Sequence, residues 1–229
     1  MAGRSGNAAT FASRMYRFYT TLRAPRLPAG VRAMNPYADA VARRYVRAYL
    51  DRYYADSRPR LLAFGINPGR FGAGITGVTF TDPVALADFC GIANDLPRRR
   101  ELSSVFVYDF IERFGGVRAF TAKCFLTAVA PLGFTRGGVN LNYYDVPALA
   151  RACEPFIVAS VERHLAIGGR RDRAIVLGRG KNLEAMRRLN DAHGWFGELV
   201  GLDHPRFIMQ YGRRRVAEYL QRFRDAFAA

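Results

Sequence analysis

The sequence predicts an α/β protein in which a mostly parallel sheet of four strands is covered by helices on both faces. Four short apolar runs end in turns or loops, and segments with a helical spacing of apolar residues separate them. Strands that alternate with helices are typical of a parallel sheet between two helical layers. The 229 residues suffice for one large domain with a buried core, and the chain shows no internal repeat.

The first 30 residues are basic and are interrupted by Gly, Pro and Ser, with no sustained period. We therefore expect residues 1–30 to form a basic, partly ordered arm and residues 31–229 to form a single domain. The first helix should begin at Asn35, a capping residue that precedes Pro36, and continue to Tyr54. Its apolar face should consist of Val41, Tyr45, Ala48 and Tyr53.

The remaining elements follow from the same signals. The four expected strands are residues 58–66, 124–132, 174–178 and 197–205. One helix should begin at Asp82 and end near Gly91, and another, capped by Ser103 or Ser104, should end at Gly115. Three further helices should begin at Asp145, near Gly180 and near Gly212. The apolar stripe of the last helix should be Val216, Leu220, Phe223 and Phe227.

The chain carries 35 Lys and Arg against 19 Asp and Glu, a formal net charge of +16. Only Lys123 and Lys181 are lysines, so nearly all of the positive charge is arginine. Two interpretations compete: a polyanionic ligand, above all nucleic acid, or a compositional bias toward Arg and Ala. Because such a bias explains Arg in place of Lys but not the shortage of acidic residues, we favour nucleic acid.

Several classes of protein are excluded. No run of about 18 apolar residues occurs, which argues against a membrane-spanning helix, and the N-terminus lacks the apolar stretch of a secretory signal. We expect a cytoplasmic protein of bacterial type that is associated with the nucleoid, is a monomer and contacts no membrane. The three cysteines, three histidines and scattered acids form no ligand cluster, so no metal or other cofactor is expected. Cys124 and Cys153 stand among apolar residues and should pack in the core.

In an open α/β sheet, ligands bind at the carboxyl ends of the strands. Four loops should lie there: residues 66–80, 131–144, 178–182 and 203–211. The third loop fails the phosphate-loop pattern, but Lys181 at a helix start can still hold one DNA phosphate.

The run GINPGRFGAGITGVTF at 65–80, together with His204-Pro205, resembles the uracil-DNA glycosylase superfamily, and most of all its single-strand-selective monofunctional (SMUG-like) branch. Weaker likeness extends from about residue 60 to 225, through FLTAVAPL and Asn140-Leu141. The matching positions of the first motif are Gly65, Asn67, Pro68, Gly69, Phe71, Gly72, Thr76, Gly77, Val78 and Phe80.

The resemblance implies a three-layer α/β/α sandwich around a four-stranded, mostly parallel sheet. It also implies an enzyme without cofactors that flips a damaged base out of DNA, single- or double-stranded, and hydrolyses its N-glycosidic bond in base excision repair. Asn67 falls on the residue that positions the attacking water, Phe80 on the aromatic that stacks on the flipped base, and His204 on the donor to the base carbonyl.

The pocket should also include Ile66, Gly69, Phe71, Thr127 and Ala128. Arg206 and Phe207 fall on the loop that wedges into the duplex, and DNA contacts are expected from Arg70, Arg179, Lys181, Arg206, Phe207 and Arg213. The segment Phe207–Met209 has a second interpretation, in which its apolar residues pack against the last helix.

The sequence departs from the family at the second strand, where Ala128 replaces the asparagine that pairs with the uracil edge. Base choice must then depend on other groups, with Thr127, Asn140 and Asn142 as candidates. The substrate base is uracil, with xanthine, hypoxanthine or 5-hydroxymethyluracil as further candidates. An alternative function is a non-catalytic nucleic-acid-binding module on the same fold.

Overall fold

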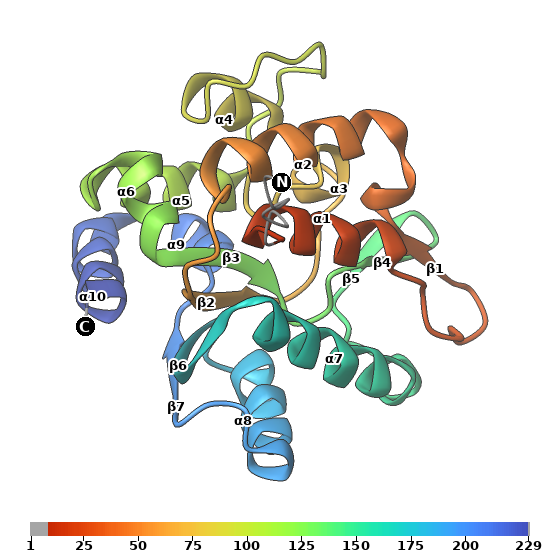
Figure 1. Ribbon diagram of the computed structural model, residues 1–229. Coiled ribbons are helices and arrows are strands. Elements are labelled where there is room, and N and C mark those ends of the chain that lie inside the picture. Colours follow the sequence, from red (N-terminus) through yellow and green to blue (C-terminus); the bar gives the residue numbers. More distant parts are fainter. Residues whose placement is uncertain (1–8, 229) are drawn as a thin grey trace, which may run out of the picture.

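The computed structural model describes residues 9–228 (Figure 1). Its central sheet contains four strands in the order β3 (Cys124–Ala128), β2 (Arg60–Gly65), β6 (Gly169–Leu177) and β7 (Glu198–Leu202). Every neighbouring pair is parallel, which confirms the predicted sheet. β6 begins five residues before the predicted strand, because its charged start, Arg170–Arg173, carries no apolar signal.

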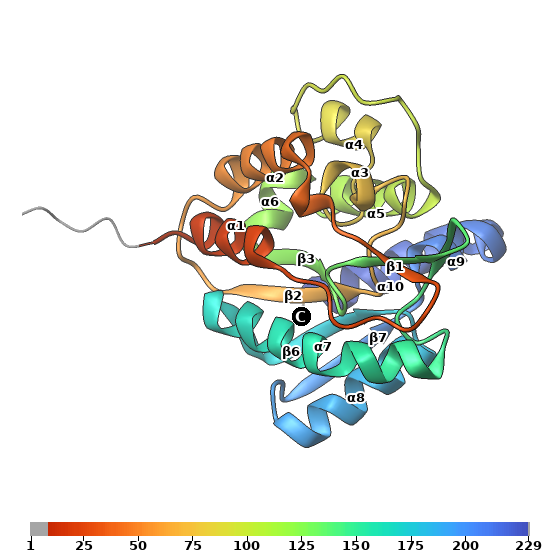
Figure 2. The ribbon, with the colours of Figure 1, turned by 90° about the vertical axis from the view of Figure 1, so that its right-hand side faces the viewer.

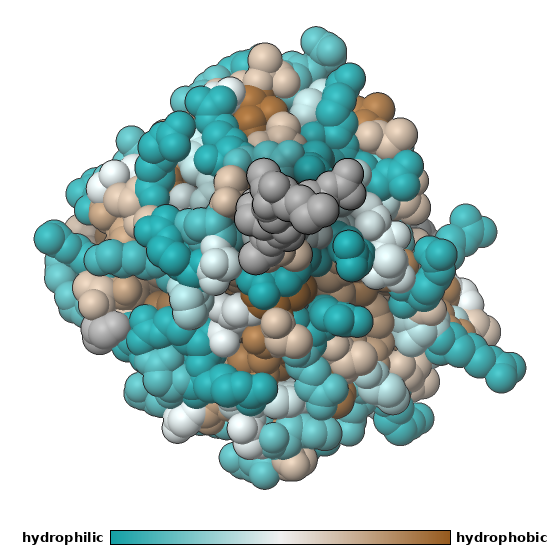
Figure 3. Space-filling model, in the orientation of Figure 1, coloured by the Kyte–Doolittle hydropathy of each residue, from teal (hydrophilic) through white to brown (hydrophobic). Residues whose placement is uncertain are grey.

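Helices cover both faces of this sheet, so the predicted three-layer sandwich is confirmed (Figures 1 and 2). One layer holds α5 (Leu102–Arg113), α6 (Gly116–Lys123) and α10 (Val216–Ala228), joined by rings such as Phe110 and Phe223, whose centroids lie 5.5 Å apart. The other holds α1 (Phe11–Thr21), α7 (Pro147–Ile167) and α8 (Lys181–His193). Figure 3 shows that hydrophilic residues cover most of the face turned to the viewer in Figure 1.

Helix α1 corrects the prediction of an arm over residues 1–30. Its side chains Phe11, Met15 and Phe18 are buried, and Thr10 caps it by accepting a hydrogen bond from the Ser13 backbone N–H at 3.1 Å. Phe18 packs edge-on against His164 of α7, with ring centroids 5.0 Å apart. The helical spacing of these residues was hidden by interleaved Arg, Ser and Thr. Residues 1–8 of the predicted arm lie outside the described residues.

The predicted helix at 35–54 consists of two elements, the 3-10 turn η1 (Pro36–Ala38) and the helix α2 (Ala40–Tyr53). Asn35 caps the turn, while Asp39 caps α2. The buried face also differs from the predicted one: Tyr45 is buried as predicted, but Val41 is 44% exposed and Ala48 is exposed. The buried residues of α2 are Ala42, Tyr45, Val46, Tyr49 and Leu50.

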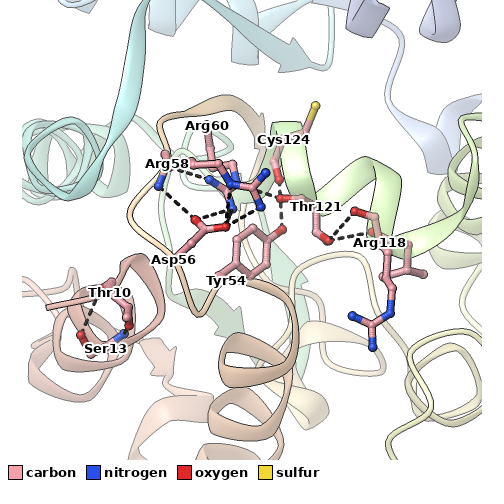
Figure 4. Close-up of polar contacts among 10 residues, drawn as sticks. Thr10, Ser13, Tyr54, Asp56, Arg58, Arg60, Arg118, Thr121 and Cys124 are labelled. Atoms are coloured by element: carbon pink, nitrogen blue, oxygen red, sulfur yellow. Dashed lines mark hydrogen bonds and ion pairs between the residues drawn. The ribbon is translucent and has the colours of Figure 1, made fainter. Parts of the chain in front are cut away.

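The amino end of the sheet is built around Arg60, the first residue of β2, whose side chain is fully buried (Figure 4). Its Nε donates to the Thr121 carbonyl at 2.8 Å, Nη1 donates to the Arg58 carbonyl at 2.6 Å, and Nη2 donates to the Asp56 carboxylate at 2.9 Å. A buried guanidinium is tolerated only when it is paired and hydrogen-bonded in this way. The backbone N–H of Phe11 donates to the Asp56 carbonyl, so the same cluster anchors α1.

Between β2 and β3 the chain forms α3 (Ala73–Thr76), α4 (Pro83–Asp88), α5 and α6. Asp82 caps α4 as predicted, accepting a hydrogen bond from the Ala85 backbone N–H at 2.8 Å. The predicted caps of α5 are wrong, because Glu101 is its N-cap and both Ser103 and Ser104 lie inside it. Helix α6 was not predicted; its Val117, Phe120 and Thr121 are buried in a stretch too short to show a period.

A second sheet was also not predicted. It is antiparallel, with the order β1 (Val31–Met34), β4 (Gly133–Arg136) and β5 (Val139–Leu141). Its strands are too short for an alternating pattern to stand out. The Met34 side chain reaches two glycines of neighbouring segments, since a Cβ at Gly74 or Gly133 would lie less than 3 Å from it. This sheet therefore packs directly on the 66–80 loop.

The C-terminal segment contains one further unpredicted helix. The predicted loop 203–211 is the short helix α9 (Pro205–Tyr211), which the 3-10 turn η2 (Arg213–Arg215) joins to α10. On α10, Leu220, Phe223 and Phe227 are buried as predicted, and Val216 is half-buried. Cys124 and Cys153 are fully buried, as predicted.

The substitution Phe11→Ala tests whether α1 is part of the domain. Removing a ring that is fully buried should lower the free energy of unfolding by about 3–5 kcal/mol, measured by chemical denaturation. The exposed Arg17 on the same helix supplies the control, and Arg17→Ala should change stability by about 0.5 kcal/mol or less. Equal stabilities of the two variants would contradict the packing of α1.

Candidate active site

A cavity of about 340 Å³ opens at the carboxyl ends of β2 and β3. The structure brings together three of the four predicted loops there, and the start of α5 completes the wall. The third loop, 178–182, contributes none of the lining residues. The polar side chains in the wall belong to Asn67, Thr79, Glu101, Ser103, Asn140, Asn142, His204, Arg206, Gln210 and Tyr211.

Asn67 is held in one orientation by the backbone of the following segments. Its Nδ2 donates to the Leu141 carbonyl at 3.1 Å, and its Oδ1 accepts from the Tyr143 backbone N–H at 3.0 Å. Tyr143 is fixed in turn, since its hydroxyl donates to Asn182 Oδ1 at 2.9 Å. An amide carries two N–H donors and two acceptor lone pairs, so one of each stays available to a water or a ligand.

Phe80 lies against the end of β2 with an unusual backbone conformation. Its φ of 56° is in the left-handed region, which is rare for an aromatic residue. A Cβ at Gly65 would lie 2.7 Å from Phe80 Cζ, so the ring packs on bare backbone. The Thr76 hydroxyl holds the preceding turn, donating to the Thr81 carbonyl at 2.7 Å. The centroids of the Phe80 and His204 rings are 5.7 Å apart.

His204 caps α9 and is neutral at physiological pH. Its Nδ1 accepts a hydrogen bond from the Arg206 backbone N–H at 3.2 Å, so the proton of the ring is on Nε2. Burial, with the nearby Arg206 charge, lowers the pKa of His204 to about 4. The imidazole therefore presents a neutral N–H donor in the wall of the cavity.

Four of the six predicted pocket residues line the cavity: Ile66, Gly69, Phe80 and Ala128. Phe71 does not, and its ring instead packs against two guanidinium groups, with Arg70 Cζ and Arg99 Cζ 4.9 and 3.6 Å from the ring centroid. Thr127 does not either. Successive side chains of a strand point to opposite faces, so Ala128 faces the cavity while the Thr127 hydroxyl hydrogen-bonds His164 Nε2 of α7 at 2.8 Å.

Sequence reasoning missed two lining residues at the start of α5, Glu101 and Ser103, and Glu101 is the charged one. It follows three arginines rather than a strand, so no signal connected it with the other loops. Its carboxylate lies against the glycines of the first loop, since a Cβ at Gly72 would collide with Oε2. Burial raises the pKa of Glu101, and Asp82 adds to this, while Arg206 and Arg99 oppose it. Asn140 and Asn142, two of the three candidates for base choice, also line the cavity.

The predicted DNA contacts divide into two groups. Arg206 and Phe207 line the cavity on α9, and both are exposed. The residues of the 207–209 segment differ in burial: Phe207 is 48% exposed, whereas Ile208 is fully buried in the core. Outside the cavity, Arg179, Lys181 and Arg213 are exposed and Arg70 is half-buried on Phe71.

Neither lysine of the chain lines the cavity. Lys123 ends α6, ahead of β3 and therefore at the opposite end of the sheet, and Lys181 begins α8. Within residues 9–228, no three His, Cys, Asp or Glu side chains are grouped so that they could hold a metal ion.

Two histidines with lowered pKa values should make stability fall in mild acid. His164 donates from Nδ1 to the Ser160 carbonyl at 2.7 Å, and burial lowers its pKa to about 4, as for His204. Between pH 6.5 and about 4 the unfolded chain binds protons at both rings and the folded chain does not. The free energy of unfolding should then fall by about 1.4 kcal/mol per pH unit for each histidine.

Chemical denaturation of the wild type and of His164→Gln at several pH values measures this loss. The variant should lose less stability than the wild type as the pH falls from 6.5 to 4, with values above pH 7 as the common reference. Parallel pH profiles would contradict the neutral state of the buried ring.

Comparisons with known proteins agree with this architecture. A sequence model of the Uracil DNA glycosylase superfamily matches residues 52–228. A crystal structure described as wild-type SMUG2 of Pedobacter heparinus superposes with a TM-score of 0.93 at 38% identity, covering 96% of this chain and 97% of that one. No curated protein sequence matches. In the described part of the chain, every helix is too short or too polar to cross a membrane.

Both matches extend over most of the chain and include the loops that form the cavity. The predicted family is thus confirmed, and an enzyme is favoured over a non-catalytic binding module. The chain belongs to the uracil DNA glycosylase superfamily, in its SMUG-like branch, and is a DNA glycosylase.

Proposed function

We propose that this enzyme is a monofunctional glycosylase that removes a flipped, damaged base from DNA by hydrolysis, as a step of base excision repair. Uracil is the first candidate base, followed by xanthine, hypoxanthine and 5-hydroxymethyluracil. The observation that carries the proposal is the convergence of Asn67, Phe80 and neutral His204 on one cavity. We expect a monomer that acts in the cytoplasm, where it meets the DNA of the nucleoid.

A base within a duplex cannot reach such a cavity, so it must leave the stack at a cost of a few kcal/mol. The Phe80 ring offers a flat apolar surface on which the flipped base stacks. Phe207, exposed at the rim of the cavity, fits the role of a wedge that fills the vacated space, with Arg206 beside it. Stacking on Phe80 and insertion of Phe207 both favour the extrahelical state of the base.

When the C1′–N bond breaks, its electron pair leaves with the base and the sugar becomes oxocarbenium-like. The Nε2–H of His204 donates to a base carbonyl, where the negative charge accumulates. One well-placed donor of this kind contributes about 3–4 kcal/mol to the transition state. The neutral imidazole can fill this role because its remaining ring proton is on Nε2, which is a hydrogen-bond donor.

Asn67 positions the water that adds to C1′. A neutral amide is a poor base, so it orients the water, and as the new C1′–O bond forms the water's proton passes to the base anion that has left. The two backbone hydrogen bonds to Asn67 fix the amide before DNA binds. Strand cleavage through a Schiff base needs an amine nucleophile, and neither lysine lines the cavity, which supports a monofunctional enzyme.

The substitution Asn67→Ala should reduce the single-turnover release of uracil from an oligonucleotide at least a hundredfold, with little change in DNA affinity. His204→Ala should likewise lower the rate without loss of binding, because its donor acts on charge that develops in the transition state. Release of the base is measured from the alkali-labile sites that it leaves in the oligonucleotide. DNA affinity is measured by fluorescence anisotropy.

The outcomes separate the alternatives. If the wild type produces no alkali-labile site with uracil or any other candidate base, the proposed reaction is wrong and the binding-module alternative gains. An unchanged rate in His204→Ala would exclude the role of its imidazole, whatever Asn67→Ala shows.

Arg213 tests the electrostatic part of binding. Its side chain is exposed and lies outside the cavity, so it should contact phosphate rather than a base. Arg213→Ala should weaken binding to all sequences equally and should reduce the slope of log affinity against log salt by about one. A sequence-dependent effect would contradict a phosphate contact. Arg113→Ala, on the exposed face of α5 beside Asp109, is the control and should leave the slope unchanged.

A further inference from the structure

We propose that Glu101 and Asn140 together read the imide edge of the flipped base, the carboxylate accepting from the ring N–H and the amide donating to the adjacent carbonyl. This inference rests on the proposed function and names the groups that select its substrate. The asparagine that serves this purpose in the family is replaced by Ala128, whose methyl group lines the cavity but forms no hydrogen bond.

The geometry follows from Gly69, which also lines the cavity. A Cβ built on Gly69 would lie 3.0 Å from Glu101 Oε1 and 3.8 Å from Asn140 Nδ2. A hydrogen-bond acceptor and a donor thus flank the same point in the wall, left free because residue 69 has no side chain. This arrangement repeats, with two residues, the acceptor and donor that one amide would present.

The amide of Asn140 is available for this role. It forms no hydrogen bond with any residue in the described part of the chain, and its Oδ1 is shielded from solvent without a partner. Asn140 is half-buried, and the Nδ2 of the same amide, which lies beside Gly69, remains available as a donor. By contrast, the amide of Asn142, which lines the same cavity, donates to Asp145 Oδ1 at 3.3 Å.

Backbone contacts hold the main chain of both residues in place. Asn140 lies on β5 opposite Thr135 of β4, and the next residue, Leu141, accepts the hydrogen bond from Asn67. The Glu101 backbone N–H donates to Asp82 Oδ2 at 2.7 Å at the start of α5. The residues that read the base are therefore held in register with the one that positions water.

A carboxylate in this wall does not suit a phosphate, which it would repel, but it suits a neutral N–H donor. Four charged or polar side chains face it: Arg206 of α9, Asp82, Ser103 and Arg99. The two arginines favour the ionised, accepting form, against burial and Asp82.

Uracil, 5-hydroxymethyluracil, hypoxanthine and xanthine all carry a ring N–H next to a carbonyl. Cytosine and adenine instead present an unprotonated ring nitrogen beside an amino group, so acceptor would face acceptor and donor would face donor. Such mismatched buried groups discriminate strongly against the wrong substrate. Thymine has the same imide edge as uracil, so this pair does not distinguish the two.

The experiment measures single-turnover release of uracil, hypoxanthine and cytosine from otherwise identical single-stranded oligonucleotides. Asn140→Ala should lower the release of uracil and hypoxanthine at least tenfold. Glu101→Gln, whose amide can donate as well as accept, should lower the preference for uracil over cytosine at least tenfold. Asn94→Ala and Glu162→Gln make the same changes outside the cavity and should keep the wild-type rates and preference.

Folding is checked by thermal melting and by binding to an oligonucleotide that carries a stable abasic analogue. If Asn140→Ala does not fold, Asn140→Asp keeps the shape but lacks the donor, and the same loss is expected. Wild-type rates and preference in folded Asn140 and Glu101 variants would overturn the inference while leaving the proposed function intact. A wild type that releases none of the bases would instead overturn the proposed function.

Discussion

The active site depends on the contact between Phe80 and Gly65. The ring packs where any side chain at residue 65 would collide with it, and the backbone of Phe80 adopts a left-handed conformation to reach this position. Strain of this kind persists only where the surroundings enforce it. Here Thr76 and the end of β2 do so. As a result, a flat aromatic ring stands beside His204 in the wall of the cavity.

Much of this architecture could be predicted from the sequence because apolar runs and glycine-rich loops are local signals. The four strands of the central sheet were located, and the motif at 65–80 indicated Asn67 and Phe80. His204 could be placed because a strand and a proline flank it. Once the sheet is parallel, its topology alone brings these loops to one edge.

The rest required tertiary contacts. Whether Thr127 or Ala128 faces the cavity depends on the register of β3, which a short buried strand does not reveal. Glu101 reaches the site only because α5 begins beside the first loop, far from it in the sequence. Helix α1 had the right spacing, but its amphipathic face acquires meaning only against α7 and β3.

The two sheets meet at the cavity. Asn67, Phe80 and His204 follow strands of the central parallel sheet, whereas Asn140 belongs to the small antiparallel sheet. The small sheet also holds Asn67, because the Leu141 carbonyl of β5 accepts its hydrogen bond. One short strand thus carries the residue proposed to read the base and fixes the residue proposed to position water. A substitution in residues 133–141 that displaces β5 should therefore change base preference and rate together.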